Sequence, residues 1–120
     1  MAKKILIVDD EPSTLKLFAN KFRREGYDVV TAIDGRSAIE TAVKEKPDLI
    51  LLDIVLPDMN GFRICKTLKS LEATKKSKVI VFTNKLDTVD AAEARLSSAD
   101  EFIEKMADST ILLAAVRKLI

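Results

Sequence analysis

Short apolar runs and amphipathic stretches alternate along this chain. The apolar runs are rich in Ile, Val and Leu, and acids, hydroxyls or turn residues bound them. A run of this kind is typical of a strand that is buried on both faces of a sheet. We therefore predict five strands, over residues 5–8, 28–32, 48–53, 78–83 and 100–103.

Amphipathic helices are predicted between these strands. The first begins near Pro12, which suits the first turn of a helix, and ends at Gly26. The second follows a turn at Asp34 and stops at Pro47, and the third follows the next turn. The residues expected to face inward are Leu15, Phe18, Ala19 and Phe22 in the first helix, Ala38, Ile39, Ala42 and Val43 in the second, and Phe62, Cys65 and Leu68 in the third, with Ile64 and Leu71 as further candidates.

The last two helices differ in apolar content. The fourth, which Asp87 could cap, carries mostly alanines and is expected to pack loosely or to form a surface. Its apolar residues are Val89, Ala91, Ala92, Ala94, Leu96 and Ala99. Ser109 is expected to cap the fifth helix, whose predicted inward residues are Ile111, Leu112, Ala115, Val116 and Leu119.

Five strands that alternate with five helices predict a parallel sheet with right-handed crossovers and helices on both faces. The fold class is therefore α/β, with a doubly wound sheet. A length of 120 residues fits one domain, expected over residues 1–120. We find no internal repeat and no low-complexity segment.

Composition narrows the possible functions. The 20 Lys and Arg residues nearly balance the 19 Asp and Glu residues, so we expect no direct contact with nucleic acid. The chain contains no His. This excludes a Ser-His triad, a histidine metal site and a phosphohistidine carrier within it.

The expected location is cytoplasmic. No apolar run approaches the roughly 20 residues that cross a bilayer, and residues 1–10 do not resemble a signal peptide, so we expect no membrane partner. The single cysteine, Cys65, cannot form an intrachain disulfide, which agrees with a reducing cytosol. Its neighbours indicate a buried helical thiol rather than a catalytic one.

Polar residues follow or end four of the predicted strands. Asp9 and Asp10 follow the first strand, Asp53 ends the third, Thr83 ends the fourth, and Lys105 lies just beyond the fifth. Because the carboxyl ends of parallel strands meet at one edge of a sheet, we expect these side chains to converge there.

This convergence predicts acyl phosphate chemistry. Three clustered carboxylates repel one another unless a hard cation neutralises them, and oxygen ligands suit Mg²⁺. In this interpretation Asp53 attacks phosphorus, Lys105 balances charge on the phosphoryl oxygens, and the Thr83 hydroxyl hydrogen-bonds one of them. Taken singly, each residue has an ordinary structural explanation: an acid could cap the first helix, Thr83 could merely end a strand, and Lys105 could be a surface charge. Their joint placement favours the functional interpretation.

These residues resemble the motifs of the receiver domain of two-component response regulators, over essentially the full length of the chain. The paired acids of that family match Asp9 and Asp10 in ILIVDDEP, and its phosphoacceptor matches Asp53 in LILLDIVLPDMNG. Its hydroxyl residue matches Thr83, and its lysine matches Lys105 in DEFIEKM.

The resemblance implies further features. The fold would be flavodoxin-like with sheet order 2-1-3-4-5, as in the chemotaxis receiver. Val55 falls where the family donates a backbone carbonyl to the metal, and Phe102 falls where an aromatic residue switches together with Thr83. A histidine kinase or phosphotransfer protein would donate the phosphoryl group. A downstream protein or effector domain would bind the face made by the fourth helix, the fifth strand and the fifth helix.

A receiver of this kind catalyses its own phosphorylation and dephosphorylation at Asp53 without being a conventional turnover enzyme. Three departures from the family pattern bear on rates and output. Met106 replaces the usual Pro after Lys105, Asn84 replaces the usual small Ala or Gly after Thr83, and Ser98 replaces a common Gly. We expect the Lys105–Met106 peptide to be trans, because a cis bond before a residue other than Pro costs roughly 2.5 to 4 kcal/mol.

Two alternatives stay open at this stage. One is a pseudo-receiver that binds proteins independently of phosphorylation, and the other is a phosphatase that uses Asp53 as its nucleophile. The phosphatase would need a second catalytic acid near the nucleophile and a cap over the substrate, for which 120 residues leave no room. The sequence does not name the kinase, the pathway, the output or the oligomeric state.

Overall fold

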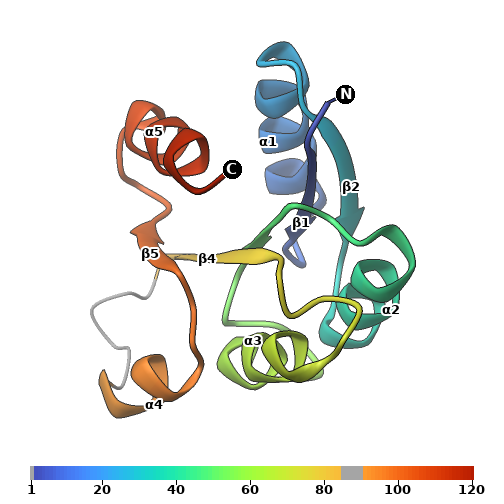
Figure 1. Ribbon diagram of the computed structural model, residues 1–120. Helices are drawn as coiled ribbons and strands as arrows, with labels where there is room; N and C mark the ends of the chain where they lie inside the picture. The colour runs from blue at the N-terminus through green and yellow to red at the C-terminus, as the bar shows by residue number, and fades with distance from the viewer. Residues whose placement is uncertain (1, 85–90) are drawn as a thin grey trace.

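A computed structural model describes residues 2–84 and 91–120, apart from the side chain of Ala91. Within these residues, strands and helices alternate as predicted (Figure 1). Their bounds are β1 (Lys4–Val8), α1 (Pro12–Arg24), β2 (Asp28–Ala32), α2 (Gly35–Glu45), β3 (Leu49–Leu52), α3 (Gly61–Ser70), β4 (Lys78–Thr83), α4 (Ala91–Leu96), β5 (Glu101–Glu104) and α5 (Ser109–Leu119).

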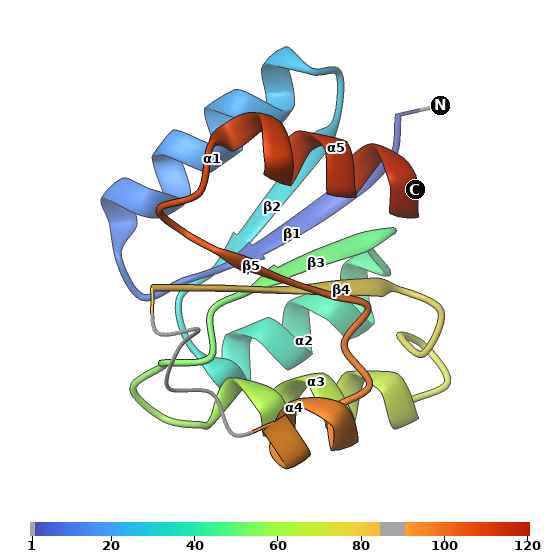
Figure 2. The ribbon, with the colours of Figure 1, turned by 90° about the vertical axis from the view of Figure 1, so that its left-hand side faces the viewer.

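The strands form one parallel sheet in the order β2-β1-β3-β4-β5, which confirms the predicted topology. Figure 2 shows α1 and α5 on one face of this sheet and α2, α3 and α4 on the other. The central strand β3 pairs with β1 on one side and with β4 on the other. All four of its residues are buried, as the uninterrupted apolar run predicted.

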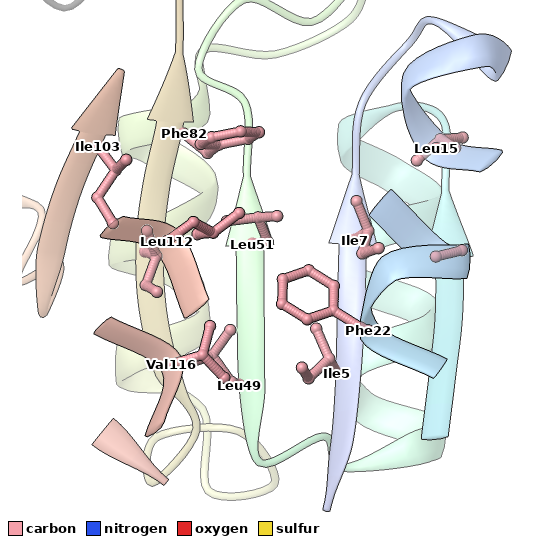
Figure 3. Close-up of a cluster of buried hydrophobic side chains, with 12 residues drawn as sticks. Ile5, Ile7, Leu15, Phe22, Leu49, Leu51, Phe82, Ile103, Leu112 and Val116 are labelled. Carbon is pink, nitrogen blue, oxygen red and sulfur yellow. The ribbon is translucent and has the colours of Figure 1, made fainter. Parts of the chain in front are cut away.

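Two hydrophobic clusters lie on opposite faces of the sheet. Side chains alternate between the faces of a strand, so Leu49 and Leu51 belong to the cluster under α1 and α5, whereas Ile50 and Leu52 belong to the cluster under α2 and α3. Figure 3 shows the first cluster, in which Phe22 of α1 fills the space over the sheet. This two-sided burial fixes the carboxyl ends of the strands, where the candidate site lies.

Three details of the helices differ from the prediction. Asp108, not Ser109, caps α5: its carboxylate accepts the backbone N–H of Thr110 at 2.9 Å. A capping side chain must precede the first helical residue, and Ser109 is that residue. Ile111 and Val43 are exposed rather than inward-facing, because the buried stripe of each helix is narrower than its apolar stripe.

The short helix α4 agrees with the prediction of a loosely packed surface element. It spans six residues, and Leu96 in its last turn is 69% exposed. The predicted cap Asp87 and the apolar Val89 lie outside the described residues. Ser98 has a φ of 63°, in the left-handed region, which explains why glycine suits this position.

Two further expectations concern the backbone and the membrane. Among the described residues no peptide bond is cis, so the expected trans bond between Lys105 and Met106 is confirmed. None of the helices in the described part of the chain has the length and apolar character to span a bilayer.

Candidate functional site

The predicted site residues gather at the carboxyl edge of the sheet. In Figure 3 the arrowheads of β1, β3, β4 and β5 point the same way, so residues at or just beyond these strand ends share one edge. The backbone N–H of Asp9 donates to the carbonyl of Ala32 at 3.1 Å, and that of Asp53 donates to the carbonyl of Val8 at 3.1 Å. The sheet ladder therefore extends by one bond past β1 and β3, and it fixes the backbone of both acids.

Three carboxylates form the centre of the site. One oxygen each from Asp9, Asp10 and Asp53 lies within 4.8 Å of the others. Asp9 is 2% exposed and Asp53 is 7% exposed, whereas Asp10 is exposed. These acids adjoin a pocket of about 200 Å³ that opens to solvent. The pocket is lined by Asp10, Glu11, Asp53, Val55, Thr83, Asn84 and Lys105.

Lys105 joins the two buried acids. Its ammonium donates hydrogen bonds to Oδ2 of Asp9 and, at 3.0 Å, to Oδ2 of Asp53. Its backbone N–H donates to the carbonyl of Thr83 at 3.1 Å, which sets where the side chain starts. Burial lowers the pKa of the Lys105 ammonium, but the hydrogen bonds and negative charges of Asp9 and Asp53 outweigh it, so the net pKa is raised.

Hydrogen bonds from the backbone orient the two buried carboxylates. Oδ1 of Asp9 accepts the N–H of Glu11 at 3.0 Å, and Oδ1 of Asp53 accepts the N–H of Val55 at 3.1 Å. Asp9 thus contributes to the turn before α1, although the cap position itself is Glu11, which makes no side-chain capping bond. Asp9 therefore orders this turn without capping α1, and its functional role stays a prediction.

The donor set fits a hard divalent cation. The cluster holds three carboxylates, and the Lys105 ammonium pairs with two of them, Asp9 and Asp53, so negative charge in the cluster exceeds positive charge. Carboxylate oxygens, a backbone carbonyl and water are the ligands that Mg²⁺ prefers. Val55 lines the pocket, as its predicted role requires, and the use of its carbonyl as a ligand stays a prediction.

The two predicted switch residues lie at β4 and β5. Thr83 is buried at the end of β4. Phe102 is half-buried in β5, and its ring lies 6.3 Å from that of Phe62 in α3, tilted by 52°. A half-buried aromatic residue is compatible with the core and with a switch, so the switching roles of both residues stay predictions.

Gly61, the first residue of α3, lies against the backbone next to the candidate phosphoacceptor, a contact that was not predicted from the sequence. A Cβ atom added to it would lie 2.3 Å from Cα of Ile54 and 2.8 Å from the carbonyl oxygen of Asp53. The start of α3 is therefore in close contact with the backbone of Asp53 and Ile54. The signal available in the sequence was the Asn-Gly pair, which marks a turn but not this contact.

Cys65 is expected to be unreactive in the native protein. Burial raises the pKa of its thiol to about 11, and the thiol donates to the carbonyl of Ser97 at 3.2 Å. At pH 8 only about one thiol in a thousand would be ionised, and the thiolate is the reactive form. An aromatic disulfide reagent, which releases a yellow thiolate when it reacts with a thiol, should label Cys65 only after the protein is denatured. Rapid labelling of the native protein would contradict this assignment.

The sequence profile of the response regulator receiver domain matches residues 5–117. The response regulator PleD of Caulobacter vibrioides is 37% identical over 119 residues, which cover 99% of this chain and 26% of PleD. The chain spans about half or less of the length of the curated relatives it matches.

Solved structures show the same fold. The chemotaxis response regulator CheY4 of Vibrio cholerae superposes with a TM-score of 0.90 at 27% identity, with all of both chains covered. The response regulator TrrA of Thermotoga maritima, solved in complex with Mg²⁺ and BeF, superposes with a TM-score of 0.88 at 30% identity, with 98% of this chain and 99% of that chain covered.

Proposed function

The chain belongs to the response regulator receiver domain family of two-component signalling, and from this premise we propose that Asp53 is its phosphoacceptor. The observation that carries the proposal is the pair of contacts on Asp53. One carboxylate oxygen accepts from the Lys105 ammonium and the other accepts from the backbone of Val55, beside two further acids. The contacts orient the carboxylate, which lines a pocket that opens to solvent and so is within reach of a phosphoryl donor.

The proposed reaction transfers a phosphoryl group to Asp53. A carboxylate oxygen of Asp53 forms the new bond to phosphorus while the bond from phosphorus to the donor's leaving group breaks. The Lys105 ammonium balances negative charge on the phosphoryl oxygens, and its long flexible stem lets it follow them. The Thr83 hydroxyl hydrogen-bonds one of these oxygens.

Asp10, Asp53 and the Val55 carbonyl would hold Mg²⁺, with Asp9 acting partly through water. When bound there, the ion supplies positive charge and orients the phosphoryl oxygens. The three carboxylates support this assignment, and so does the Thermotoga receiver, which was solved with Mg²⁺ and BeF.

The proposed partners follow from the same chemistry. A histidine kinase or phosphotransfer protein would supply the phosphoryl group, because the chain has no His of its own. Phosphorylation would act through Thr83 and Phe102 on a protein-binding face formed by α4, β5 and α5. We place the domain, residues 1–120, in the cytoplasm and assign it no direct contact with nucleic acid.

Incubation with acetyl phosphate and Mg²⁺, followed by intact mass measurement, tests the assignment. We expect the wild-type protein to gain one phosphoryl group, and the Asp53→Asn variant to gain none, because an amide is too weak a nucleophile. An unchanged wild-type mass, under conditions that label a control receiver, would favour the pseudo-receiver alternative. Labelling of the Asp53→Asn variant would show that the acceptor is a different residue.

A further inference from the structure

The loop from Ile54 to Asn60 touches α2, far from it in sequence. Oδ1 of Asp58 accepts the backbone N–H of Gly35 at 2.7 Å, and Oδ2 accepts that of Arg36 at 3.0 Å. Both donors lie in the first turn of α2, more than 20 residues before Asp58. The carboxylate of Asp58, in the loop after β3, thus binds two backbone N–H groups at the start of α2.

Asp58 is not the only residue that caps α2. Asp34, at the N-cap, accepts the N–H of Ser37 at 2.8 Å and completes a capping box with the Ser37 hydroxyl. Asp58 satisfies the two N–H groups before Ser37, which the local cap leaves over. The hydrogen bond from Gly35, followed by those from Arg36 and the loop backbone, lowers the pKa of Asp58, so this carboxylate stays charged opposite the helix N-terminus.

Packing reinforces the contact. A Cβ atom on Gly35 would lie 2.8 Å from Sδ of Met59 and 2.9 Å from its Cβ. The loop therefore packs closely against the first turn of α2 through the side chain of Met59.

The base of the same loop is tied as well. Val55 pairs with Asn60 in an isolated bridge, and the N–H of Gly61 donates to the carbonyl of Ile54 at 3.0 Å. The side chain of Val55 is 48% exposed, so packing alone does not fix its position. The loop is anchored at three points: these ties at its base, the side chain of Leu56 on the cluster under α2 and α3, and the contact of Asp58 with α2.

We propose that Asp58 is a positioning residue, which holds the Ile54–Asn60 loop on α2 and thereby sets the backbone of Val55 beside Asp53. A shift of the Val55 backbone would act on Asp53 directly, because the N–H of Val55 donates to Oδ1 of Asp53. The consequence for cation binding and phosphoryl transfer rests on the proposed function. The tether, meaning the pair of hydrogen bonds from Gly35 and Arg36 to Asp58, does not rest on it. The tether and the proposed function can therefore be tested separately.

The matched pair of variants is Asp58→Ala and Asp34→Ala. Each removes a carboxylate that accepts N–H groups at the start of α2, but only Asp58 joins the helix to the loop. Amide hydrogen exchange at Val55, measured without metal, should be faster in Asp58→Ala and unchanged in Asp34→Ala. Unchanged exchange in Asp58→Ala, or an equal rise in both variants, would overturn the proposal.

A Mg²⁺ titration by calorimetry extends the test. Removing an outer partner of a metal ligand typically weakens binding by about 10- to 100-fold, and we expect roughly tenfold for Asp58→Ala. Asp58→Asn keeps one oxygen acceptor and should lie between Asp58→Ala and wild type, whereas Asp34→Ala should match wild type. Equal affinities of Asp58→Ala and wild type would overturn the positioning role. If wild type bound no Mg²⁺ and took no phosphoryl group, the proposed function would fail, while the exchange measurement would still decide the tether.

Discussion

Replacing Gly61 with alanine is expected to lower the free energy of unfolding by about 3 kcal/mol, at the upper end of the usual cost of overpacking. The added methyl group would lie 2.3 Å from Cα of Ile54 and 2.8 Å from the carbonyl oxygen of Asp53. Both obstacles are backbone atoms, so no side-chain rotation can relieve the clash. Urea denaturation of the variant and the wild type measures the difference.

Gly26→Ala is the matched control. Gly26 has a φ of 92°, unfavourable for alanine, but a Cβ atom there meets nothing within 4 Å. Its cost is backbone strain alone, about 1 kcal/mol. Gly61→Ala should also slow labelling of Asp53 by acetyl phosphate, because the methyl group displaces the backbone beside the phosphoacceptor, whereas Gly26→Ala should label normally. Equal unfolding midpoints for Gly61→Ala and wild type would show that α3 can shift away without cost.

The strands could be predicted because they depend on local sequence, and the convergence of the acids could be predicted because the strands are parallel. A strand buried on both faces needs a continuous apolar run, and Leu49–Leu52 supplies one of strand length that turn residues follow. The strands are parallel, so a polar residue directly after one strand must lie near a polar residue after its neighbour. This is why Asp9 and Asp53 could be placed together from sequence positions alone.

Contacts between loops could not be predicted in this way. The hydrogen bond from Gly35 to Asp58 depends on how the loop after β3 meets the start of α2, and the close approach of Gly61 to Ile54 depends on how that loop folds back on itself. No periodicity records such a meeting, and an Asp in a turn has several local uses. The cap of α5 shows the same limit at a smaller scale, because Asp108 and Ser109 are both good capping residues and the helix start decides between them.

Lys105→Met is expected to slow phosphoryl transfer from acetyl phosphate by about 100-fold. Removing one group that stabilises transition-state charge typically costs about 10²- to 10³-fold in rate. Methionine retains most of the lysine stem, so the change chiefly removes the ammonium that contacts Asp9 and Asp53. Lys118→Met, at an exposed position on α5, removes the same charge away from the site and should leave the rate unchanged. Intact mass measured over time gives both rates.

The same substitution should lower stability when no divalent cation is present. Asp9 and Asp53 would be left buried without their shared cation, and loss of one partner from a buried ion pair costs about 3 to 5 kcal/mol. The pocket opens to solvent, so we expect about 2 kcal/mol, below that range. Asp9→Asn in the Lys105→Met background should recover part of the loss, because it removes one of the two unpaired charges. If denaturation instead showed the double variant to be less stable than Lys105→Met alone, the contacts of Asp9 with the backbone of Glu11 would outweigh its repulsion of Asp53.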